Sequence, residues 1–310
     1  VAELIVEVPL IEKKRKAGHF VIVRIDEKGE RIPLTISNAD AEKGTITLIL
    51  QKVGVSTHKI ASLKAGDSLC DVVGPLGKAT HIENFGTVLC CGGGVGVAPL
   101  LPIVQAMKAA GNKVISVLAA RTKDLIILED EIRKCSDEVY IMTDDGSYGE
   151  KGVVTMGMEK AIAKEKIDFC MAIGPSIMMK FAALTTQKYA IPTYASLNTI
   201  MVDGTGMCGA CRVTVDGQTK FVCVDGPEFD AHLVDFDEAM RRQTMYRTHE
   251  IATDAPGHHC NLTQNVQQSE KASEIVVEKF TKVKVREQDP DIRAKNFEEV
   301  SYGYNEDEAM

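Results

Sequence analysis

A chain of 310 residues with 45% hydrophobic and 26% charged residues is long enough to form two or three packed domains. Its formal net charge of −8 argues against nucleic acid or an anionic membrane as its main partner. The nine cysteines are an odd number and do not suggest a disulfide framework, so we expect a reducing, cytoplasmic location.

The first 84 residues have the pattern of β-strands. Short β-branched or alternating runs are separated by clusters of Gly, Asp and Lys, such as residues 26–29. We predict strands at residues 4–8, 20–25, 32–36, 45–50 and 68–73. Strands of this kind close most naturally into a small antiparallel barrel.

Two short segments of this region contain residue types suited to binding. The first is Arg-Ile-Pro-Leu-Thr at residues 31–35. The second is Gly-Val-Ser-Thr at residues 54–57, whose small residues could present backbone N–H groups and hydroxyls to a phosphate. From the residues alone, a β-turn and an exposed loop explain the two segments equally well.

The pattern changes at Thr87. A strand of the buried type at residues 87–91 is followed by a glycine loop and by an apolar helical stretch at residues 100–110. The loop contains Gly92, Gly93, Gly94 and Gly96. This order of elements offers backbone N–H groups to a pyrophosphate, as in dinucleotide sites. The glycine spacing differs from the common Rossmann fingerprint, and a glycine turn of an ordinary α/β domain is the alternative.

Strands and helices alternate from this loop to about residue 189. We predict strands at residues 114–119, 139–143 and 169–173, and helices at residues 128–135, 153–164 and 177–189. This order predicts a doubly wound parallel sheet, which binds ligands at the carboxyl ends of its strands. Those ends contain Arg121, Asp145, Gly174 and Pro175. Arg121 lies near the position where NAD enzymes carry an acid, which favours NADP slightly and leaves the choice open.

Three cysteines further along the chain have the spacing of metal ligands. Cys208 and Cys211 form a Cys-x-x-Cys pair in a glycine-rich stretch, residues 201–211, that suits a tight turn. Residues 212–215 and 219–224 have strand patterns and are joined by Asp-Gly, a strong hairpin signal. The hairpin would bring Cys223 back beside the first pair.

Asp203 stands five residues before Cys208, where the plant-type iron–sulfur spacing has a cysteine. We therefore predict a [2Fe–2S] site with three thiolates and one carboxylate. Its ligands are Asp203, Cys208, Cys211 and Cys223. A zinc site, which accepts the same ligand types, and reduced cysteines in an ordinary hairpin are the alternatives.

In combination, these motifs resemble the ferredoxin–NADP⁺ reductase superfamily. The resemblance covers about residues 1–260 and includes Gly-Gly-Gly-x-Gly-x-Ala-Pro, Thr-Asp-Asp-Gly-Ser and Gly-Pro-x-x-Met-Met. Within the superfamily, the chain resembles the electron-transfer subunit of class B dihydroorotate dehydrogenase. It is more similar still to the small subunit of the NADH-dependent reduced-ferredoxin:NADP⁺ oxidoreductase, an electron-bifurcating transhydrogenase. That family has a [2Fe–2S] cluster with one aspartate ligand, which falls on Asp203, whereas the dihydroorotate branch uses four cysteines.

The resemblance implies that the barrel binds FAD. Residues 33–35 take the place of the superfamily's Arg-x-Tyr-Ser motif, with Ile32 in place of Arg and Leu34 in place of Tyr. Thr35 is then near the isoalloxazine. The implied FAD residues are Arg31, Pro33, Leu34, Thr35, Gly54, Ser56 and Thr57. The resemblance also places the pyridine nucleotide at the glycine loop and strand ends, and it favours NAD(H) over NADP(H).

The last part of the chain is polar and charged from about residue 264, apart from an amphipathic piece at residues 275–285. Residues 289–304 resemble the opening of the large subunit of the same transhydrogenase. We therefore expect the natural polypeptide to fuse the two subunits, and a disordered acidic tail is the alternative.

We predict an FAD-binding antiparallel β-barrel at residues 1–85 and a doubly wound NAD(P)-binding α/β domain at residues 86–196. A [2Fe–2S] domain at residues 197–262 and a tail at residues 263–310 would follow. The expected function is electron transfer between NAD(H) and a large partner subunit or fused domain, and indirectly ferredoxin, without a catalytic acid or base. The alternatives are a dihydroorotate dehydrogenase subunit and a zinc-stabilised nucleotide-binding protein without redox activity.

Overall fold

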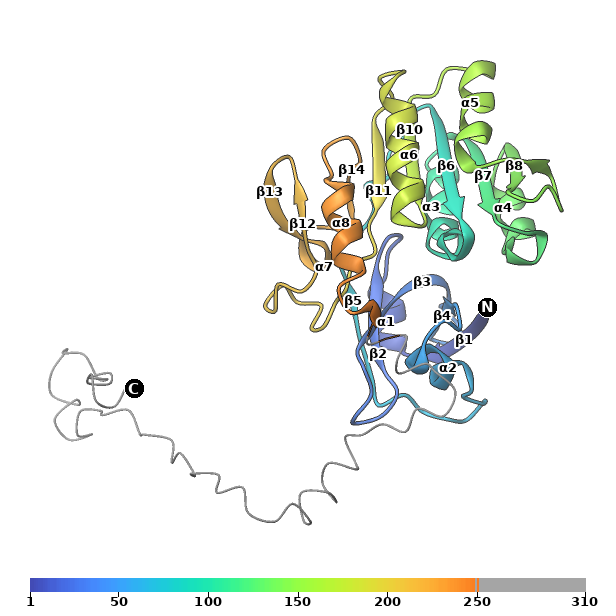
Figure 1. The fold of residues 1–310 in the computed structure, drawn as a ribbon. Coiled ribbons are helices and arrows are strands. Elements are labelled where there is room, and N and C mark those ends of the chain that lie inside the picture. Colours follow the sequence, from blue (N-terminus) through green and yellow to red (C-terminus); the bar gives the residue numbers. More distant parts are fainter. Residues whose placement is uncertain (249, 251–310) are drawn as a thin grey trace, which may run out of the picture. The chain divides into compact units, whose positions relative to one another are not determined.

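The computed structural model describes residues 1–248 and 250 (Figure 1). These residues belong to the first of the two compact units of the chain, residues 1–258. The predicted tail, with its resemblance to a large subunit, and the end of the predicted iron–sulfur domain lie outside the described residues. None of the described helices has both the length and the apolar character needed to cross a membrane.

The N-terminal part is an antiparallel sheet with the strand order β1-β4-β3-β2-β5. Its strands are β1 (Ala2–Glu7), β2 (Phe20–Arg24), β3 (Ile32–Asp40), β4 (Thr45–Leu50) and β5 (Asp71–Leu76). The core includes Val21, Val23, Ile36, Ile46, Leu48 and Leu50. Helices α1 (Pro9–Lys14) and α2 (Val55–Ala61), which the strand pattern did not predict, each add one buried isoleucine to this core. The predicted barrel is confirmed.

The middle of the chain forms a sheet in the order β14-β11-β10-β6-β7-β8-β9. Its strands are β6 (Thr87–Gly93), β7 (Lys113–Ala120), β8 (Glu138–Thr143), β9 (Glu150–Lys151), β10 (Phe169–Ile173), β11 (Thr193–Ser196) and β14 (Glu228–Asp230). Every neighbouring pair is parallel except β11 and β14. The predicted parallel sheet is confirmed, and β11 and β14 extend it beyond the elements that the sequence indicated.

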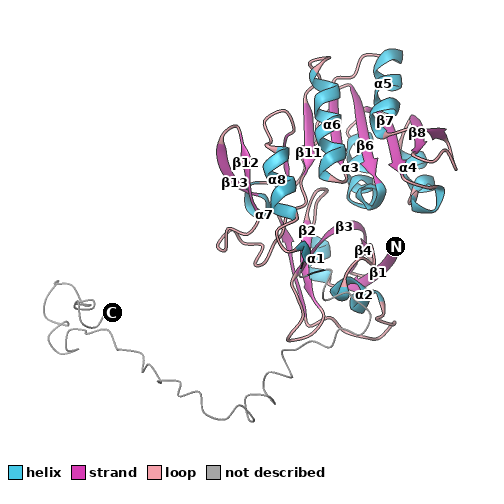
Figure 2. Cartoon of the chain, viewed as in Figure 1, coloured by secondary structure: helices cyan, strands magenta, loops and turns pink. Residues whose placement is uncertain are grey.

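Helices cover both faces of this sheet (Figure 2). Successive strand residues point to opposite faces, so Val88 and Cys90 pack into one core and Leu89 and Cys91 into the other. The first core is covered by α3 (Val97–Ala109) and α4 (Glu129–Cys135), and the second by α5 (Val154–Lys164), α6 (Ser176–Gln187) and α8 (Phe236–Gln243). Because the crossovers return the chain to the same end of the sheet, the carboxyl ends of the parallel strands meet at one edge.

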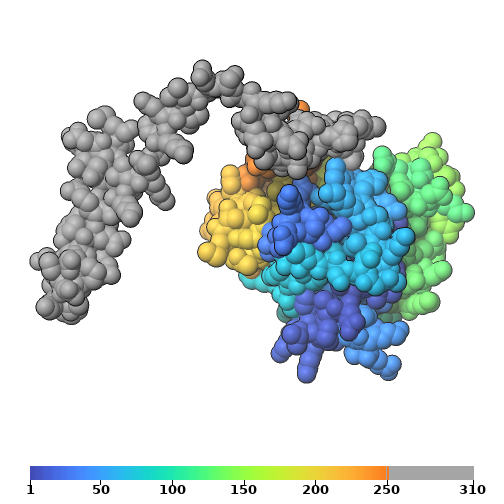
Figure 3. Space-filling view, turned by 90° about the horizontal axis from the view of Figure 1, so that it is seen from below, coloured from blue at the N-terminus to red at the C-terminus, as the bar shows by residue number. Residues whose placement is uncertain are grey.

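The segment with the cysteines leaves the sheet at one strand and returns to it at the next. Ser196, at the end of β11, lies opposite Glu228, at the start of β14. Between them are β12 (Arg212–Val215), β13 (Gln218–Phe221) and the helical turn α7 (Val222–Asp225). Seen from below, the blue to cyan barrel residues lie between the yellow residues of this segment and the green residues of the parallel sheet (Figure 3).

Glu228 ties the parallel sheet to the connection that follows the barrel. Its Oε1 atom accepts a hydrogen bond from the Thr80 hydroxyl at 2.5 Å, and the backbone N–H of Thr80 donates to the Ala17 carbonyl at 2.9 Å. Burial raises the pKa of Glu228 to about 7, against a smaller lowering by the hydrogen bond from Thr80. The folded protein therefore keeps this carboxyl protonated to a higher pH than the unfolded chain does.

We expect Glu228→Gln to remove one part of the pH dependence of stability. The folded pKa of about 7 lies above the ordinary value of 4.5, so the wild type loses stability as pH rises between these two values. The amide keeps an acceptor for Thr80 but carries no charge. The variant should match the wild type near pH 4 and exceed its unfolding free energy near pH 8 by up to about 3 kcal/mol.

Denaturant unfolding across this pH range measures the effect on the unfolding free energy. The matched control is Glu159→Gln, because Glu159 is exposed on α5. Parallel pH profiles for Glu228→Gln and the wild type would contradict the role of burial at this carboxyl.

Candidate functional site

The cysteine loop, residues 201–211, connects β11 to β12 and is folded tightly by its glycines. Gly204, Gly206 and Gly209 have φ angles of +76°, +86° and +67°, which residues with a Cβ atom rarely adopt. A Cβ atom on Gly204 would lie 2.5 Å from Cδ1 of Ile22. The loop therefore packs directly on strand β2 of the barrel.

Cys211 and Cys223 form a buried pair of thiols. Their Sγ atoms are 3.2 Å apart, and the backbone N–H of Cys223 donates to Sγ of Cys211 at 3.5 Å. Burial, followed by the contact with Cys211, raises the pKa of the Cys223 thiol to about 12. Its surroundings thus keep the Cys223 thiol protonated unless a positive charge lies beside it.

The position of Cys223 corrects one expectation from the sequence. The second strand of the hairpin ends at Phe221, and Cys223 lies in the helical turn α7 rather than in a strand. The turn forms because the Asp225 carboxylate accepts the backbone N–H of Phe221 at 2.8 Å and the N–H of Val222 donates to the Cys211 carbonyl at 3.1 Å. The predicted return of Cys223 to the cysteine loop is nevertheless confirmed for Cys211.

Asp203 is bound to the part of the loop that contains Cys208. Its carboxylate accepts the backbone N–H groups of Thr205 at 2.9 Å and Cys208 at 3.0 Å. The bond from Thr205, followed by those from Cys208, lowers the pKa of Asp203. Asp203 is half-buried and Cys208 is exposed. An ionised carboxylate therefore lies beside the third cysteine.

An iron–sulfur centre suits this set of donors. Two thiolates on one tetrahedral metal with bonds of about 2.3 Å stand roughly 3.7 Å apart, close to the separation of the Cys211 and Cys223 sulfurs. Within the described part of the chain, no three Cys, His, Asp or Glu side chains are close enough to form a complete metal site. The structure thus brings the four predicted ligands together as two pairs, Cys211 with Cys223 and Asp203 with Cys208.

The two barrel segments predicted to bind FAD lie together. Pro33, Leu34 and Thr35 belong to β3 and pair with residues of β2. The hydroxyl of Ser56, at the start of α2, donates to a carboxylate oxygen of Glu30, just before β3. Segments more than twenty residues apart in the sequence are therefore joined at one end of the barrel.

The groups next to this junction suit a phosphate. Arg31 Nε is buried and has no hydrogen-bond partner among the residues described, which is costly for a charged group. A Cβ atom on Gly54 would meet nothing within 4 Å, so the backbone is open there. The Thr57 hydroxyl is instead engaged in the turn, accepting the N–H of Gly54 at 3.0 Å and donating to its carbonyl at 2.9 Å. A flavin phosphate fits the arginine and the open backbone, rather than the threonine hydroxyl.

The residues predicted to bind a pyridine nucleotide gather at the carboxyl edge of the parallel sheet. The order β10-β6-β7-β8 makes neighbours of the four strand ends that carry them. The backbone N–H of Asp145, after β8, donates to the carbonyl of Arg121, after β7, at 3.3 Å. The Asp145 carboxylate accepts the backbone N–H of Ser147 at 2.9 Å. One turn thus fixes both predicted polar residues.

The glycine loop is pressed against the turn that follows β10. Gly92 and Gly93 end β6, and the short 3₁₀ helix η1 (Gly94–Gly96) leads into α3. A Cβ atom on Gly96 would lie 2.6 Å from the Ile173 carbonyl oxygen and 2.8 Å from Cα of Gly174. A Cβ atom on Gly93 would likewise meet Pro175 at 3.2 Å. The predicted glycines therefore allow two backbones to touch at this edge.

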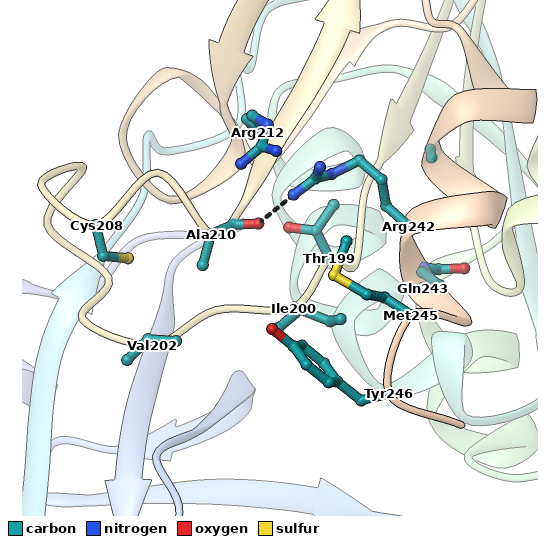
Figure 4. Close-up of a pocket in the computed structure, with 11 residues that line it drawn as sticks. Thr199, Ile200, Val202, Cys208, Ala210, Arg212, Arg242, Gln243, Met245 and Tyr246 are labelled. Atoms are coloured by element: carbon teal, nitrogen blue, oxygen red, sulfur yellow. Dashed lines mark hydrogen bonds between the residues drawn. The ribbon is translucent and has the colours of Figure 1, made fainter. Parts of the chain in front are cut away.

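A cavity of about 370 Å³ beside the cysteine loop was not expected from the sequence (Figure 4). It is lined on one side by Cys208 and Arg212 and on the other by Arg242 and Tyr246. Arg212 follows Cys211 directly, which is a signal in the sequence for a cation beside the loop. Arg242 comes from α8, and nothing in the local sequence indicates that it reaches this place.

Comparison with known protein families finds two matching models. The model of the iron-sulfur cluster binding domain of dihydroorotate dehydrogenase B matches residues 198–235. The model of the oxidoreductase NAD-binding domain matches residues 90–183. The first match covers the cysteine loop and the hairpin, and the second covers most of the parallel sheet.

The chain is also similar to individual proteins. It is 53% identical over 242 residues to the dihydroorotate dehydrogenase B (NAD(+)), electron transfer subunit homolog of Thermotoga maritima, an alignment that covers 78% of this chain and 86% of the relative. It is 35% identical over 238 residues to the dihydroorotate dehydrogenase B (NAD(+)), electron transfer subunit of Bacillus caldolyticus, covering 74% and 90%. A solved structure of an NADH-dependent reduced ferredoxin-NADP oxidoreductase is 50% identical, with a TM-score of 0.77 and coverage of 80% and 90%.

Proposed function

The chain belongs to the family of electron-transfer subunits of dihydroorotate dehydrogenase B and their homologues, and on that basis we propose that it carries electrons from NADH through its cysteine loop to a larger partner subunit. It is a flavin- and iron–sulfur-dependent oxidoreductase of the ferredoxin–NADP⁺ reductase type, with FAD, an iron–sulfur cluster and NAD(H) as cofactors. The observation that supports this path for the electrons is the packing of Gly204 on Ile22 of β2. Strand β2 also pairs with residues 33–35, which are candidate flavin residues. The candidate flavin residues and iron ligands are therefore neighbours in the fold.

We assign the pyridine nucleotide to the carboxyl edge of the parallel sheet. The NAD-binding domain match over residues 90–183 and the close contact between Gly96 and Gly174 support this assignment. The glycine loop would offer backbone N–H groups to the pyrophosphate. The assigned residues are Gly92, Gly93, Gly94, Gly96, Arg121, Asp145, Gly174 and Pro175. The NAD(+) enzymes among the relatives support NAD(H) rather than NADP(H).

FAD supplies the chemistry, since it accepts a hydride from a nicotinamide and releases electrons singly. The part of this chain is to bind and orient it. In our assignment Arg31 and the open backbone at Gly54 bind phosphate, and residues 33–35 of β3 line the ring. Ser56 holds the start of α2 against Glu30 and so supports the phosphate site. This chemistry requires no catalytic acid or base from the chain.

We expect Arg31→Ala to weaken FAD binding by about 10- to 100-fold. The variant loses a charge-assisted hydrogen bond between the guanidinium, whose Nε is buried, and the flavin phosphate, worth about 1.5–3 kcal/mol. Fluorescence titration of flavin-free protein with FAD measures the dissociation constant. Lys28→Ala is the matched control, because it removes an exposed cation from the turn just before β3. Equal affinities for Arg31→Ala and the wild type would place the phosphate elsewhere.

We assign Cys211 and Cys223 to one iron of a [2Fe–2S] cluster and Asp203 and Cys208 to the other. The sulfur pair at 3.2 Å supports the first half of this assignment, and the bond from Cys208 N–H to the Asp203 carboxylate supports the second. Iron also explains how buried thiols can act as thiolates, because a bound cation lowers the pKa of its ligands.

We expect Asp203→Cys to keep the iron and to change its properties. Replacing a hard oxygen donor by sulfur alters the electron density at one iron, so the visible spectrum and the reduction potential should both shift. Spectra and redox titration of the purified variant measure the two effects. A spectrum and a potential identical to those of the wild type would remove Asp203 from the ligand set.

The finer function that we propose is electron transfer in ferredoxin-dependent transhydrogenation between NAD(H) and NADP(H). The solved oxidoreductase at 50% identity supports this reading over a dihydroorotate dehydrogenase complex. The aspartate at position 203 supports it as well, because the dihydroorotate branch is expected to have a cysteine there. In this role the chain works with a large subunit that exchanges electrons with ferredoxin.

Anaerobic titration of the purified holoprotein with NADH, and separately with NADPH, tests the proposed function. NADH should bleach the flavin bands and then the iron–sulfur shoulder, and NADPH should do so much more slowly. A protein that contains neither flavin nor iron after anaerobic reconstitution, or whose flavin is unaffected by NADH, would refute the proposal.

A further inference from the structure

The cavity beside the cysteine loop is positively charged. Figure 4 shows the guanidinium groups of Arg212 and Arg242 pointing toward each other across it. Arg242 Nη2 donates to the Ala210 carbonyl at 3.1 Å, and Arg212 Nη1 donates to the Gly209 carbonyl at 3.4 Å. In the part of the chain that the structure describes, no carboxylate forms an ion pair with either arginine, although the chain as a whole carries a net charge of −8.

Further polar groups turn toward the same space. The hydroxyl of Thr199 lines the cavity, is buried and has no hydrogen-bond partner among the described residues. The hydroxyl of Tyr246 also faces the cavity in Figure 4. Two guanidinium groups that line one cavity repel each other. Their N–H groups that have no partner within the described part of the chain match the oxygens of a carboxylate in charge and geometry. The cavity is therefore shaped for an anion with two oxygens.

The rim of the cavity has the composition of a protein interface. Met245 and Tyr246, which line the cavity, are each 52% exposed, and Met207, which precedes the lining residue Cys208, is 89% exposed. Val202, in the same loop, is 50% exposed. Methionine, tyrosine and arginine are the residue types that interfaces between proteins favour. An apolar rim around a cationic centre fits a protruding acidic side chain better than a free anion in water.

We propose that the cavity between Arg212 and Arg242 receives a carboxylate side chain of the partner subunit that takes electrons from the cluster. The inference rests on the proposed function, because only a protein that takes electrons from this loop has to cover it. Cys208 lines the cavity and is exposed, so a partner seated there lies next to an iron ligand. The bound carboxylate would fix the orientation of the partner over the cysteine loop.

The test uses holoprotein with FAD and iron in place. The probe is the purified large subunit of an NADH-dependent reduced ferredoxin–NADP oxidoreductase, titrated by calorimetry at low and at high salt. We expect Arg212→Glu and Arg242→Glu each to weaken binding by at least about tenfold, because each reverses a charge that faces the partner's acid. Arg242→Lys, which keeps the charge but not the planar set of N–H donors, should lose less affinity than Arg242→Glu. The wild type should lose affinity with salt more steeply than either charge-reversal variant.

Arg241→Glu is the matched control, since Arg241 precedes Arg242 on α8 but does not line the cavity. It reverses the same charge one position away and should bind within about twofold of the wild type. Because Arg242 also supports the loop through Ala210, flavin and iron contents are measured for every variant. Arg212→Glu tests the effect of charge on binding independently of loop stability, because the long hydrogen bond from Arg212 to Gly209 contributes little to the loop.

Two outcomes overturn the docking site. Either both charge reversals leave affinity within about twofold of the wild type, or the wild-type holoprotein does not bind the large subunit at all. If both charge reversals leave affinity unchanged, a holoprotein that still contains flavin and iron and is bleached by NADH leaves the proposed function standing. If the wild type does not bind the large subunit, the same result leaves standing only the proposed transfer of electrons from NADH to the cluster. Absence of the cofactors would instead refute the proposed function.

Discussion

Cys211→Ser is expected to abolish the iron–sulfur cluster. The thiol of Cys211 is buried, and its sulfur lies 3.2 Å from the sulfur of Cys223. A serine hydroxyl is a hard donor, ionises far less readily than a thiol and leaves Cys223 as a single thiolate on that iron. Mutation of residues that only hydrogen-bond to metal ligands lowers metal affinity by roughly 10- to 100-fold, and replacement of a ligand itself should lower it by more.

Iron content and the visible shoulder of the purified variant measure this loss. Reduction of a one-electron acceptor such as cytochrome c by NADH should fall with the iron, because the flavin then lacks its outlet through the loop. Cys135→Ser is the matched control, since that thiol lies on α4 and donates to the Glu131 carbonyl at 3.1 Å. Full iron content in Cys211→Ser would show that the cluster is bound by other residues.

Gly96→Ala is expected to damage both the nucleotide site and the stability of the fold. The added Cβ atom would lie 2.6 Å from the carbonyl oxygen of Ile173 and 2.8 Å from Cα of Gly174. These are backbone atoms, which cannot move aside as a flexible side chain can. The glycine loop must therefore separate from the turn after β10, which should cost about 1–3 kcal/mol of unfolding free energy.

The same separation should raise the KM for NADH by at least about tenfold, because small displacements of binding groups cost binding energy. Steady-state NADH oxidation and denaturant unfolding measure the two effects. Gly217→Ala serves as the control, since its Cβ would meet nothing within 4 Å and only its φ of +68° opposes the change. That variant should lose about 1 kcal/mol and keep its KM. An unchanged KM in Gly96→Ala would separate this glycine from nucleotide binding.

The sequence predicted most of the elements whose side chains follow one strong pattern. Strands at residues 45–50 and 169–173 have the predicted bounds, because one alternates clearly and the other is a continuous apolar run. The glycine loop was also predicted correctly as the link from β6 to α3. In each of these cases the local pattern and the tertiary environment require the same conformation.

Elements that depend on distant residues could not be predicted. Val222 to Val224 have the composition of a strand but form a helical turn. The Asp225 carboxylate accepts the N–H of Phe221 and the Cys211 carbonyl accepts the N–H of Val222, and these two bonds end the strand at Phe221. Strand β14 has only three residues, and it forms because it pairs with β11. In the same way Arg242 reaches the cavity only because α8 packs beside the sheet, so nothing near it in the sequence marks its place.

The pairing of Ser196 with Glu228 has a consequence for how electrons leave the protein. Both ends of the cysteine-bearing segment are pinned to adjacent strands of the sheet, so the segment cannot swing out on a tether to meet a distant acceptor. Electrons must therefore leave from the position that this segment has in the fold, and the acceptor protein has to bind there. Electron transfer in this chain should therefore be insensitive to solvent viscosity once the complex has assembled.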